Sequence, residues 1–373
     1  MVSLKRGVSL KIASIDLKNV KCFDKFHLDL VKPETEEVLS VCALVGRNGS
    51  GKSTILKSIV SVFTVFNQQY NGEIFDDSAI YKGETYLTCK INMALNEEEQ
   101  KRLNPQHANT FLRYIHTNKN TSLEDTGGHE CKGNFLAWIS KDLEQEADVE
   151  FYNTFFRLLN EDRDKVVIMY FDPFRFLTNH VPSGPNLNNI SGNPIEDALA
   201  SNISIDGMVS GREISIKQWF VNLDYIRLKE PTEKNEQIYK HMVSAFELLL
   251  SPLVFKGINV EGSIIFIDKE NDKEIEIDML SDGFKSIFLI ISEIMYRLSL
   301  LDCNEEEYFY NKEAIILIDE IDCHIHPRWQ RNLIPSLRKL FPNCQFIVTT
   351  HSPFILETLQ EYEIKQIGEK GIM

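Results

Sequence analysis

The chain has 373 residues, of which 43% are hydrophobic and 25% are charged. This balance is typical of a globular protein with one large core or two smaller ones, and it excludes a disordered or fibrous chain. No apolar run reaches the roughly 18 residues that a membrane span needs, and the N-terminus lacks the apolar stretch of a secretory signal. We therefore expect a cytoplasmic protein that does not enter a membrane.

The charge and the cysteines exclude further classes of protein. The 40 basic and 55 acidic side chains give a formal net charge of -15, which on average repels a nucleic-acid backbone and an anionic membrane surface. The seven cysteines form no Cys-x-x-Cys pair. Neither a disulfide framework nor a zinc finger is therefore expected to organise the fold.

Strands are predicted at the start of the chain. Apolar side chains alternate with polar ones around Ile15 and Leu17 and again around Phe26 and Leu28, which is the period of half-buried strands. Residues 41–45 then form an uninterrupted apolar run that ends at a glycine. Such a run predicts a strand covered on both faces.

A polar stretch follows the first predicted helix. Residues 54–66 have the spacing of a core-facing helix, and residues 67–165 are mostly polar, which indicates an insertion. Within this insertion we predict a loop at residues 117–134 and helices at residues 134–141 and 151–159.

Core-like patterns return after the insertion. Residues 166–170 predict a strand, and residues 178–211 are so rich in Asn, Ser, Gly and Pro that they predict a long mobile segment. Helical spacing follows over residues 219–250. Residues 258–279 predict a hairpin that turns at residues 268–273.

Two more buried strands are predicted near the end of the chain, and both lead into polar residues. The apolar run at residues 314–318 ends in Asp319 and Glu320, and the run at residues 346–348 leads to His351. Open α/β sheets bind ligands at the carboxyl ends of their strands. We therefore expect these side chains to share one site with the glycine-bounded end of the first buried strand.

The segment GRNGSGKS at residues 46–53 matches the phosphate-binding loop GxxxxGK[ST] at every defined position. It lies between a predicted strand and a predicted helix, so its N–H groups and the positive helix end can face a phosphate, although a chance match inside an ordinary turn is the alternative. Lys52 would neutralise the β- and γ-phosphates, Ser53 would hold Mg²⁺, and Thr54 would bind the α-phosphate. The other candidate nucleotide-binding residues of the loop are Gly46, Asn48, Gly49, Ser50 and Gly51.

Asp319 and Glu320 would supply the second half of such a site. Asp319 could hold Mg²⁺ through a water, and Glu320 could polarise the water that attacks the γ-phosphorus. Neighbouring residues of a strand point to opposite sides, so the two carboxylates need not share one role. The pair by itself is a weak signal, but together with the loop at residues 46–53 it predicts a site for ATP and Mg²⁺.

The histidines near the strand ends differ in what they could do. His351 could hydrogen-bond the γ-phosphate or the attacking water, because a neutral imidazole both donates and accepts near pH 7, and a structural role is the alternative. His324 and His326 form a His-x-His pair. For this pair a role in the loop is favoured over metal ligation.

The segment LSDGFKS at residues 280–286 begins a core-facing helix predicted at residues 284–298. Ser281 is a candidate N-cap, and Gly283 allows close backbone approach, so the helix start could bind an anion. A well-capped helix without a ligand is the alternative, and these residues by themselves favour it.

Four motifs in this order resemble those of the ABC-type ATPases of the SMC and RecF kind. They are GRNGSGKST, LSDGFKS, IILIDEIDCHIHPRWQ and FPNCQFIVTTHSPFIL, and they cover an ATP-binding core at residues 10–66 and 255–356. The combination is similar to that of the AAA-labelled prokaryotic ATPase subunits of Septu-type and retron-associated phage-defence systems.

The resemblance implies an α/β fold, an ABC-type P-loop NTPase head with an N-terminal antiparallel β-subdomain, a mostly parallel core sheet and a helical insertion. Residues 1–66 would hold the β-subdomain and the P-loop, and residues 67–254 would hold the insertion together with the strand at residues 166–170. Residues 255–373 would hold the signature, Walker B and switch-histidine segments.

The resemblance also implies roles for single residues. Ser281 and Gly283 would cap the γ-phosphate held by a second copy, so that two chains sandwich two nucleotides head to tail. The residues expected to act on the chain's own nucleotide are Lys52, Ser53 and Asp319 in MgATP binding, Glu320 as the catalytic carboxylate and His351 as the switch histidine.

The chain departs from the family pattern in three places. Asp282 replaces the first glycine of the signature, Phe284 and Lys285 replace its glutamine, and a histidine takes the place of the D-loop aspartate. These departures put the rate of hydrolysis in question. No glutamine can be assigned to the Q-loop, for which Asp172 is a stand-in.

Three functions fit these features. The first is an ATP-hydrolysing switch subunit of an anti-phage complex, a homodimer or higher oligomer that controls a separate effector nuclease of the HNH type. The 22 residues after His351 are too few for a fused nuclease domain. The second is a RecF-like repair ATPase that clamps DNA directly, and the third is a nucleotide-bound scaffold with little hydrolysis. The net charge favours the first and the third. DNA, or a reverse transcriptase with its msDNA, would be a further partner.

Overall fold

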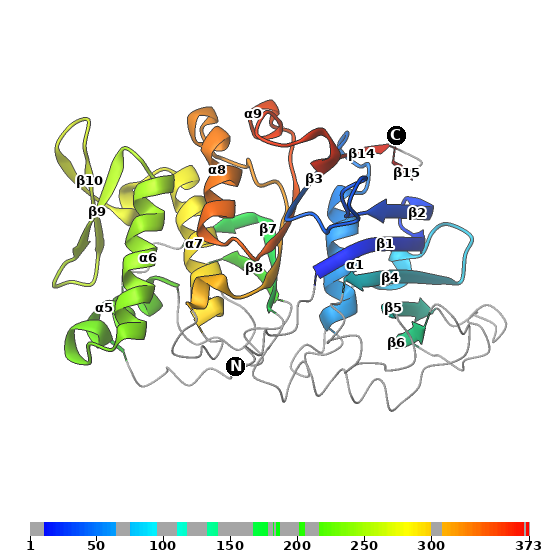
Figure 1. The fold of residues 1–373 in the computed structure, drawn as a ribbon, viewed down its shortest axis with the longest axis horizontal. Helices are drawn as coiled ribbons and strands as arrows, with labels where there is room; N and C mark the ends of the chain where they lie inside the picture. Colours follow the sequence, from blue (N-terminus) through cyan, green and yellow to red (C-terminus); the bar gives the residue numbers. More distant parts are fainter. Residues whose placement is uncertain are drawn as a thin grey trace.

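A seven-stranded sheet runs through the middle of the molecule (Figure 1). The computed structural model describes residues 11–64, 75–94, 110–117, 133–140, 167–177, 182, 184–186, 201–205, 216–299, 308–368 and 371–372. Every pairing in this sheet is parallel except the one at its edge, between residues 371–372 and residues 364–368. In spatial order the strands are β15 (Gly371–Ile372), β14 (Ile364–Gly368), β3 (Val41–Val45), β13 (Gln345–Thr349), β12 (Ala314–Ile318), β7 (Val167–Phe176) and β8 (Ser201–Ile205).

Both faces of this sheet are buried, which explains the uninterrupted apolar runs of its strands. In β12, Ile315 and Leu317 belong to one hydrophobic core, whereas Ile316 and Ile318 belong to the other. The first core also contains α1 (Lys52–Thr64), and the second contains the helices on the opposite face. The period of two along a strand thus divides one strand between two cores.

An antiparallel sheet packs with α1 against the first face (Figure 1). Its strands, in spatial order, are β2 (Phe23–Asp29), β1 (Lys11–Val20), β4 (Tyr86–Ala94), β5 (Thr110–Thr117) and β6 (Gly133–Ser140). The predicted α/β class, with an N-terminal antiparallel unit and a mostly parallel core sheet, is confirmed. The antiparallel unit also includes strands from the segment that was expected to be a helical insertion.

The helix predicted at residues 134–141 is wrong for residues 134–140, because these residues form part of β6. This strand pairs with β5 along its full length, from Thr117 opposite Gly133 to Thr110 opposite Ser140. Hydrogen bonds to a neighbouring strand outweigh a local helical spacing. The helix predicted at residues 151–159, and residues 118–132 of the predicted loop, lie outside the described residues.

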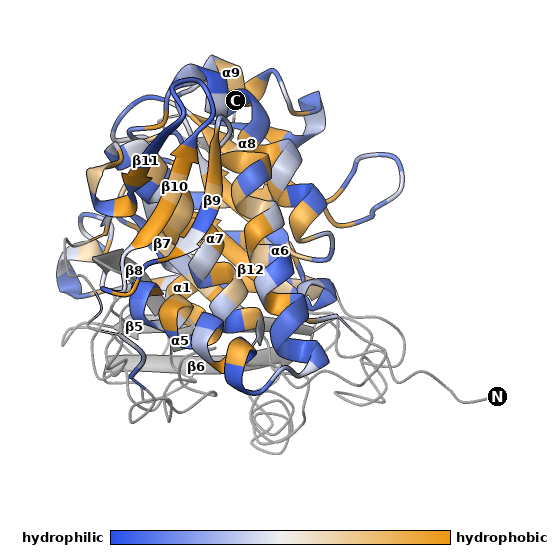
Figure 2. Cartoon of the chain, turned by 90° about the vertical axis from the view of Figure 1, so that its left-hand side faces the viewer, coloured by the Kyte–Doolittle hydropathy of each residue, from blue (hydrophilic) through white to orange (hydrophobic). Residues whose placement is uncertain are grey.

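Helices cover the other face of the central sheet. The longer ones are α5 (Ile216–Lys229), α6 (Glu233–Leu249), α7 (Asp282–Ser299) and α8 (Pro327–Leu340). Short turns are α9 (Pro353–Leu356) and the 3₁₀ segments Asp77–Ala79, Ile277–Met279, Phe309–Asn311 and Glu361–Glu363. Figure 2 looks onto α5 and α6, which carry hydrophilic and hydrophobic residues in alternating patches. No helix among the described residues has the length and hydropathy of a membrane span.

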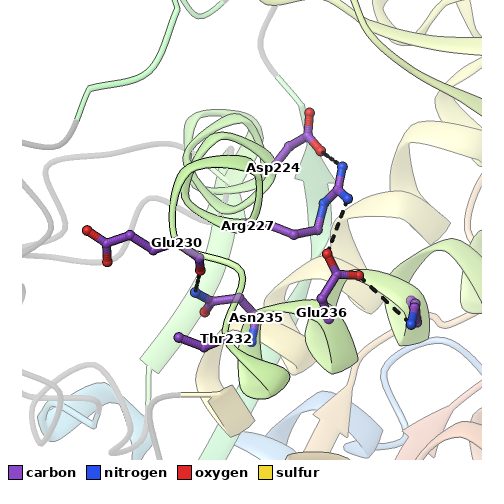
Figure 3. A network of polar contacts seen from close by, with 7 residues as sticks. Asp224, Arg227, Glu230, Thr232, Asn235 and Glu236 are labelled. Carbon is purple, nitrogen blue, oxygen red and sulfur yellow. Dashed lines mark hydrogen bonds and ion pairs between the residues drawn. The ribbon is translucent and has the colours of Figure 1, made fainter.

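The helical spacing predicted for residues 219–250 corresponds to two helices, α5 and α6, which meet at a sharp turn. The side chain of Thr232 caps the first turn of α6. Arg227 of α5 donates to Asp224 at 2.7 Å and to Glu236 of α6 at 3.4 Å, as Figure 3 shows. This network fixes the angle between the two helices.

The segment predicted to be long and mobile, residues 178–211, is held at two places. Residues 201–205 form β8, which pairs with β7. Asn186 and Asn222 of α5 bind each other through two hydrogen bonds of 2.8 Å, and Gln218 donates to the carbonyl of Gly184 at 2.9 Å. These residues thus have defined partners, and the rest of the segment, apart from residues 182 and 185, lies outside the described residues.

A small three-stranded sheet lies beside α6, with the strands β9 (Leu253–Ile258), β10 (Ile264–Asp268) and β11 (Lys273–Glu276). The strands β10 and β11 pair from Asp268 opposite Lys273 onward. The hairpin turn predicted at residues 268–273 is thus confirmed.

Gln345 joins the two large sheets. Its side-chain amide accepts from the N–H of Ile12 at 2.8 Å and donates to the carbonyls of Ile12 at 2.8 Å and Leu39 at 3.3 Å. The amide is buried, so these bonds have no competition from water.

We predict that Gln345→Leu lowers the free energy of unfolding by about 3 kcal/mol, because it leaves the buried N–H and carbonyl of Ile12 without partners. Urea unfolding measures this change. Gln366→Leu is the control, since Gln366 is exposed on β14 of the same sheet and is expected to change stability by less than about 0.5 kcal/mol. Equal stabilities of the two variants would contradict the role of Gln345.

His241 lies in an aromatic cluster between α6 and the end of α8. Its ring stacks on Tyr310 with centroids 4.2 Å apart, and Phe309 and Phe341 meet it edge-on. Nε2 lies 3.1 Å from the carbonyl of Leu340, so this nitrogen carries the proton of the neutral ring. Burial lowers the pKa of His241.

We predict that this histidine destabilises the fold in acid. Because its pKa is lowered in the folded state, the unfolded chain binds the proton more readily, and stability falls as the pH drops below the ordinary pKa of about 6.5. Thermal melting between pH 7.5 and pH 5.5 should show a smaller loss of Tm for His241→Phe, which keeps the stacked ring but does not titrate. Identical losses would contradict a contribution from His241.

Candidate functional site

Four neighbouring strands of the central sheet, β3, β13, β12 and β7, end at the same edge. Because they are parallel, their carboxyl ends lie together. The P-loop follows β3, His351 follows β13, and Asp319 and Glu320 follow β12. Asp172 lies within β7, directly after Phe171, which pairs with the last residue of β12. The residues that the sequence analysis assigned to one nucleotide are thus brought to one edge.

Close contacts explain two glycines of the P-loop. A Cβ atom on Gly51 would lie 2.3 Å from the ring of Phe23 in β2, and Gly51 has a φ of +97°. A Cβ atom on Gly46 would lie 2.3 Å from the carbonyl oxygen of Ile367 in β14. Gly49 also has a positive φ, +81°, but no atom lies within 4 Å of its missing Cβ. The loop therefore wraps tightly against its own chain at Gly46 and Gly51.

Lys52, in the first turn of α1, is only 8% exposed. Its Nζ donates to the carbonyls of Gly46 at 2.9 Å and Arg47 at 3.1 Å. Burial lowers its pKa, whereas the negative charges of Asp319 and Glu320 act in the opposite direction. An ammonium group has three N–H donors, so one remains for a ligand beside these two bonds.

Asp319 is 1% exposed at the end of β12. Oδ1 accepts from the hydroxyl of Thr349 at 2.6 Å, and Oδ2 accepts from Tyr170 at 3.2 Å. Burial, together with the charge of Asp319, raises the pKa of Tyr170, so this phenol stays a donor. The carboxylate is therefore held rigidly and keeps free lone pairs.

Glu320 differs from its neighbour in exposure and in backbone conformation. Its side chain is exposed, and its φ of +47° lies in the left-handed region that non-glycine residues rarely adopt. The hydroxyl of Thr349 accepts from the N–H of Glu320 at 2.7 Å, so one side chain orients both acidic residues. The two carboxylates differ in exposure, but both residues lie in the turn after β12, so the alternation of a strand is not the reason for this difference.

The other predicted residues of this edge divide into exposed and buried groups. The exposed ones are Asn48, Gly49, Ser53 and His351. Ser50 and Thr54 are buried, and the hydroxyl of Ser50 has no hydrogen-bond partner among the described residues.

Ser281 and Gly283 lie at the start of α7, which packs against the segment that follows β12. A Cβ atom on Gly283 would lie 2.5 Å from the carbonyl oxygen of His324. A glycine is therefore required at this position by a contact within the chain, with the backbone of His324. Its expected role at the phosphate of a second copy is separate from this requirement. Ser281 is exposed at the tip of the helix.

The departures from the family pattern have structural partners. Phe284 packs on Trp329 of α8, with ring centroids 4.0 Å apart, and the Trp329 indole donates to the carbonyl of Ser251 at 2.8 Å. The side chain of His326 caps α8 by accepting from the N–H of Arg328. His326 thus has a structural contact at the start of α8, and no cluster of three His, Cys, Asp or Glu side chains that could hold a metal is found among the described residues.

Sequence reasoning missed Arg175, which lies in β7 and donates to the carbonyls of Asp319 at 2.7 Å and Glu320 at 3.0 Å. The signal that could have found it is a charged residue inside the apolar run Phe174 to Leu177. The carboxylate of Asp172 accepts from the N–H of Phe174 at 2.9 Å, so it caps a turn at the position assigned to the Q-loop.

Two protein-family models match overlapping parts of the chain. The family model described as "AAA domain, putative AbiEii toxin, Type IV TA system" matches residues 117–357, which is more than half of the chain. The chain belongs to this AAA-domain family. A second model, "AAA ATPase domain", matches residues 10–168 and so includes the P-loop.

Two kinds of relative match this AAA ATPase, one over almost the whole chain and one over less than half of it. "Retron Vc95 probable ATPase" of Vibrio cholerae serotype O1 biovar El Tor is 25% identical over 398 residues, covering 96% of this chain and 74% of the relative. "Septu protein PtuA" of Bacillus thuringiensis is 29% identical over 171 residues, covering 44% of this chain and 42% of that protein. The resemblance to retron-associated and Septu ATPases is confirmed.

The fold of this AAA ATPase is that of an SMC head. The SMC head domain from Thermotoga maritima aligns with a TM-score of 0.50 at 13% sequence identity, covering 97% of this chain and 98% of that chain. The expected ABC-type head is therefore confirmed as a fold.

We predict that Gly51→Ala destabilises the nucleotide-free protein by about 3 kcal/mol, because the methyl group meets the Phe23 ring and the left-handed backbone is strained. Gly49→Ala carries the backbone strain without the clash and should cost about 1 kcal/mol. Urea unfolding of the two variants measures the difference. Equal costs would show that Phe23 does not hold the loop.

Proposed function

We propose that this AAA ATPase binds MgATP at the edge formed by β3, β13 and β12 and hydrolyses it. The observation that carries the proposal is that β3, β13 and β12 are parallel neighbours, so that the P-loop after β3 lies at the same edge of the sheet as Asp319 and Glu320 after β12. The third N–H of Lys52 would bind the β- and γ-phosphates. The residues that would cradle the phosphates with their backbone are Gly46, Asn48, Gly49, Ser50, Gly51 and Thr54.

The donor set fits a magnesium ion. Mg²⁺ prefers oxygen ligands and usually takes one or two from the protein, with the rest from phosphates and water. Ser53 offers an exposed hydroxyl, and Asp319 offers a carboxylate whose hydrogen bonds to Thr349 and Tyr170 leave lone pairs free. Ser53 and Asp319 would hold the ion, which when bound neutralises charge that develops on the phosphates.

Glu320 would accept a proton from the attacking water. Its exposed carboxylate stands on a backbone held from both sides, by Thr349 at its N–H and by Arg175 at its carbonyl. His351 is exposed after the neighbouring strand β13 and would hydrogen-bond the γ-phosphate or the same water.

A second copy would complete the site. Ser281 is exposed at the start of α7, so its hydroxyl can contact another molecule. The start of this helix is itself fixed by the contact of Gly283 with the carbonyl of His324. In a head-to-tail dimer Ser281 and Gly283 would cap the partner's γ-phosphate, and nucleotide would then control association. The SMC-head fold supports this arrangement.

The cellular role we infer is that of a switch subunit in anti-phage defence, which acts on a separate effector nuclease of the HNH type. The names of the retron and Septu relatives support it. The net charge of -15 disfavours a protein that clamps DNA by itself. DNA binding by the isolated chain with a steep dependence on salt would favour the RecF-like alternative.

We predict that Lys52→Ala loses Mg²⁺-dependent ATP binding, and that Glu320→Gln keeps the binding but loses at least about 100-fold in kcat, the contribution of a general base. Equilibrium dialysis and a steady-state phosphate-release assay measure these effects. Lys57→Ala, one turn further along α1, is the control and should keep both properties.

Two results would count against the proposal. A wild-type chain that retains no adenine nucleotide with Mg²⁺ would overturn the nucleotide site. Turnover that persists in Glu320→Gln would remove Glu320 from the catalytic role.

A further inference from the structure

Arg175 is a buried cation whose every donor is in use. It lies in β7 and is 3% exposed. A guanidinium group has five N–H donors, and each of them has an acceptor within 3.4 Å. The acceptors are the carbonyls of Asp172, Asp319, Glu320 and Ile321 and the hydroxyl of Ser286. With no donor left for a ligand, its role is to hold other groups in place.

These bonds join three elements at the catalytic edge. Three of them reach the consecutive carbonyls that follow β12, among them that of Glu320 at 3.0 Å. Nε donates to the hydroxyl of Ser286, at 3.0 Å, in the second turn of α7. A fixed, planar set of donors keeps all these groups in one relative geometry, which a flexible ammonium could not do.

Two packing contacts also tie the start of α7 to the same segment and to α8. Gly283 packs on the carbonyl of His324, and Phe284 packs on Trp329. Both partners follow Glu320 in the chain within the segment that leads from β12 into α8. The first turns of α7 and the segment after β12 therefore form one packed unit, with Arg175 at its centre.

Glu320 lies in this unit with a strained backbone. Its φ of +47° is unfavourable for a side chain with a Cβ atom and persists only where neighbouring groups hold it. Thr349 holds its N–H and Arg175 holds its carbonyl. The N–H of Cys323 donates to the same carbonyl at 2.9 Å, so a shift of Arg175 removes the hold that comes from β7 and leaves the one from within the loop after β12.

We propose that Arg175 is a positioning residue that couples the start of α7 to the peptide of Glu320, so that contact of a ligand with α7 sets the orientation of the catalytic carboxylate. The inference rests on the proposed function, in which α7 meets the nucleotide of a second copy while Glu320 acts on the chain's own. Arg175 then links two nucleotide sites, and filling one promotes hydrolysis in the other.

The experiment compares two serines of α7 in the full-length protein. Ser286→Ala removes only the α7 acceptor of Arg175. Ser292→Ala is the matched control, since Ser292 lies in the same helix, is likewise fully buried, and has a hydroxyl without a hydrogen-bond partner among the described residues. Measurements are MgATP affinity by equilibrium dialysis, kcat, the Hill coefficient of hydrolysis against ATP concentration, and Tm. Arg175→Lys is a third variant, which keeps the charge but not the five-donor geometry.

We expect Ser286→Ala to keep MgATP affinity within about twofold, because the P-loop is untouched, while kcat falls about tenfold, as the loss of one charge-assisted hydrogen bond predicts. Its Hill coefficient should fall to about 1 if the wild-type value is higher. Arg175→Lys should lose at least as much in kcat, and Ser292→Ala should match the wild type. A role in stability only would lower Tm without this separation of affinity from kcat.

Wild-type kcat in Ser286→Ala, or equal losses in Ser286→Ala and Ser292→Ala, would overturn the coupling and leave the nucleotide site standing. A wild-type protein that neither binds nor hydrolyses MgATP would instead overturn the proposed function, and the coupling with it. The two failures are therefore distinguishable in the same set of measurements.

Discussion

The parallel pairing of β12 with β13 on one side and β7 on the other is the constraint on which the site depends. Each of these strands is covered on both faces, so a charged side chain within them would lose its water without compensation. Polar groups are therefore confined to the strand ends or to positions with full hydrogen bonding. Because the strands are parallel, their carboxyl ends collect at one edge, and segments far apart in the sequence meet there.

Two buried cations serve this edge in different ways, and their hydrogen bonds tell them apart. Lys52 uses two of three donors on loop carbonyls, so it can still bind an anion. Arg175 uses all five of its donors on the protein. A buried charge is costly unless it is compensated. The chain thus gives every donor of Arg175 a partner, four carbonyls and one hydroxyl, and leaves one donor of Lys52 open to a phosphate.

The residues of α7 that depart from the family pattern also have a physical explanation. Phe284, which with Lys285 replaces the glutamine of the signature, packs on Trp329. The indole N–H of Trp329 in turn donates to the carbonyl of Ser251. Aromatic contact takes over the attachment of α7 to α8 at this point. The basic residues around Trp329 form ion pairs within the chain, as Arg328 does with Glu270 at 3.6 Å and Arg331 with Glu357 at 3.3 Å.

The sequence by itself determined the P-loop, the acidic pair after β12, the histidine after β13 and the α/β class, because each is encoded by neighbouring residues with a recognisable pattern. It did not reveal Arg175, Thr349 or Tyr170, whose partners lie far away in the chain. It also assigned a helix to β6, since pairing with β5 is absent from any local pattern. Only the tertiary structure decided these points, because a hydrogen bond or a strand pair between distant segments depends on the packing of the whole sheet, which local spacing does not encode.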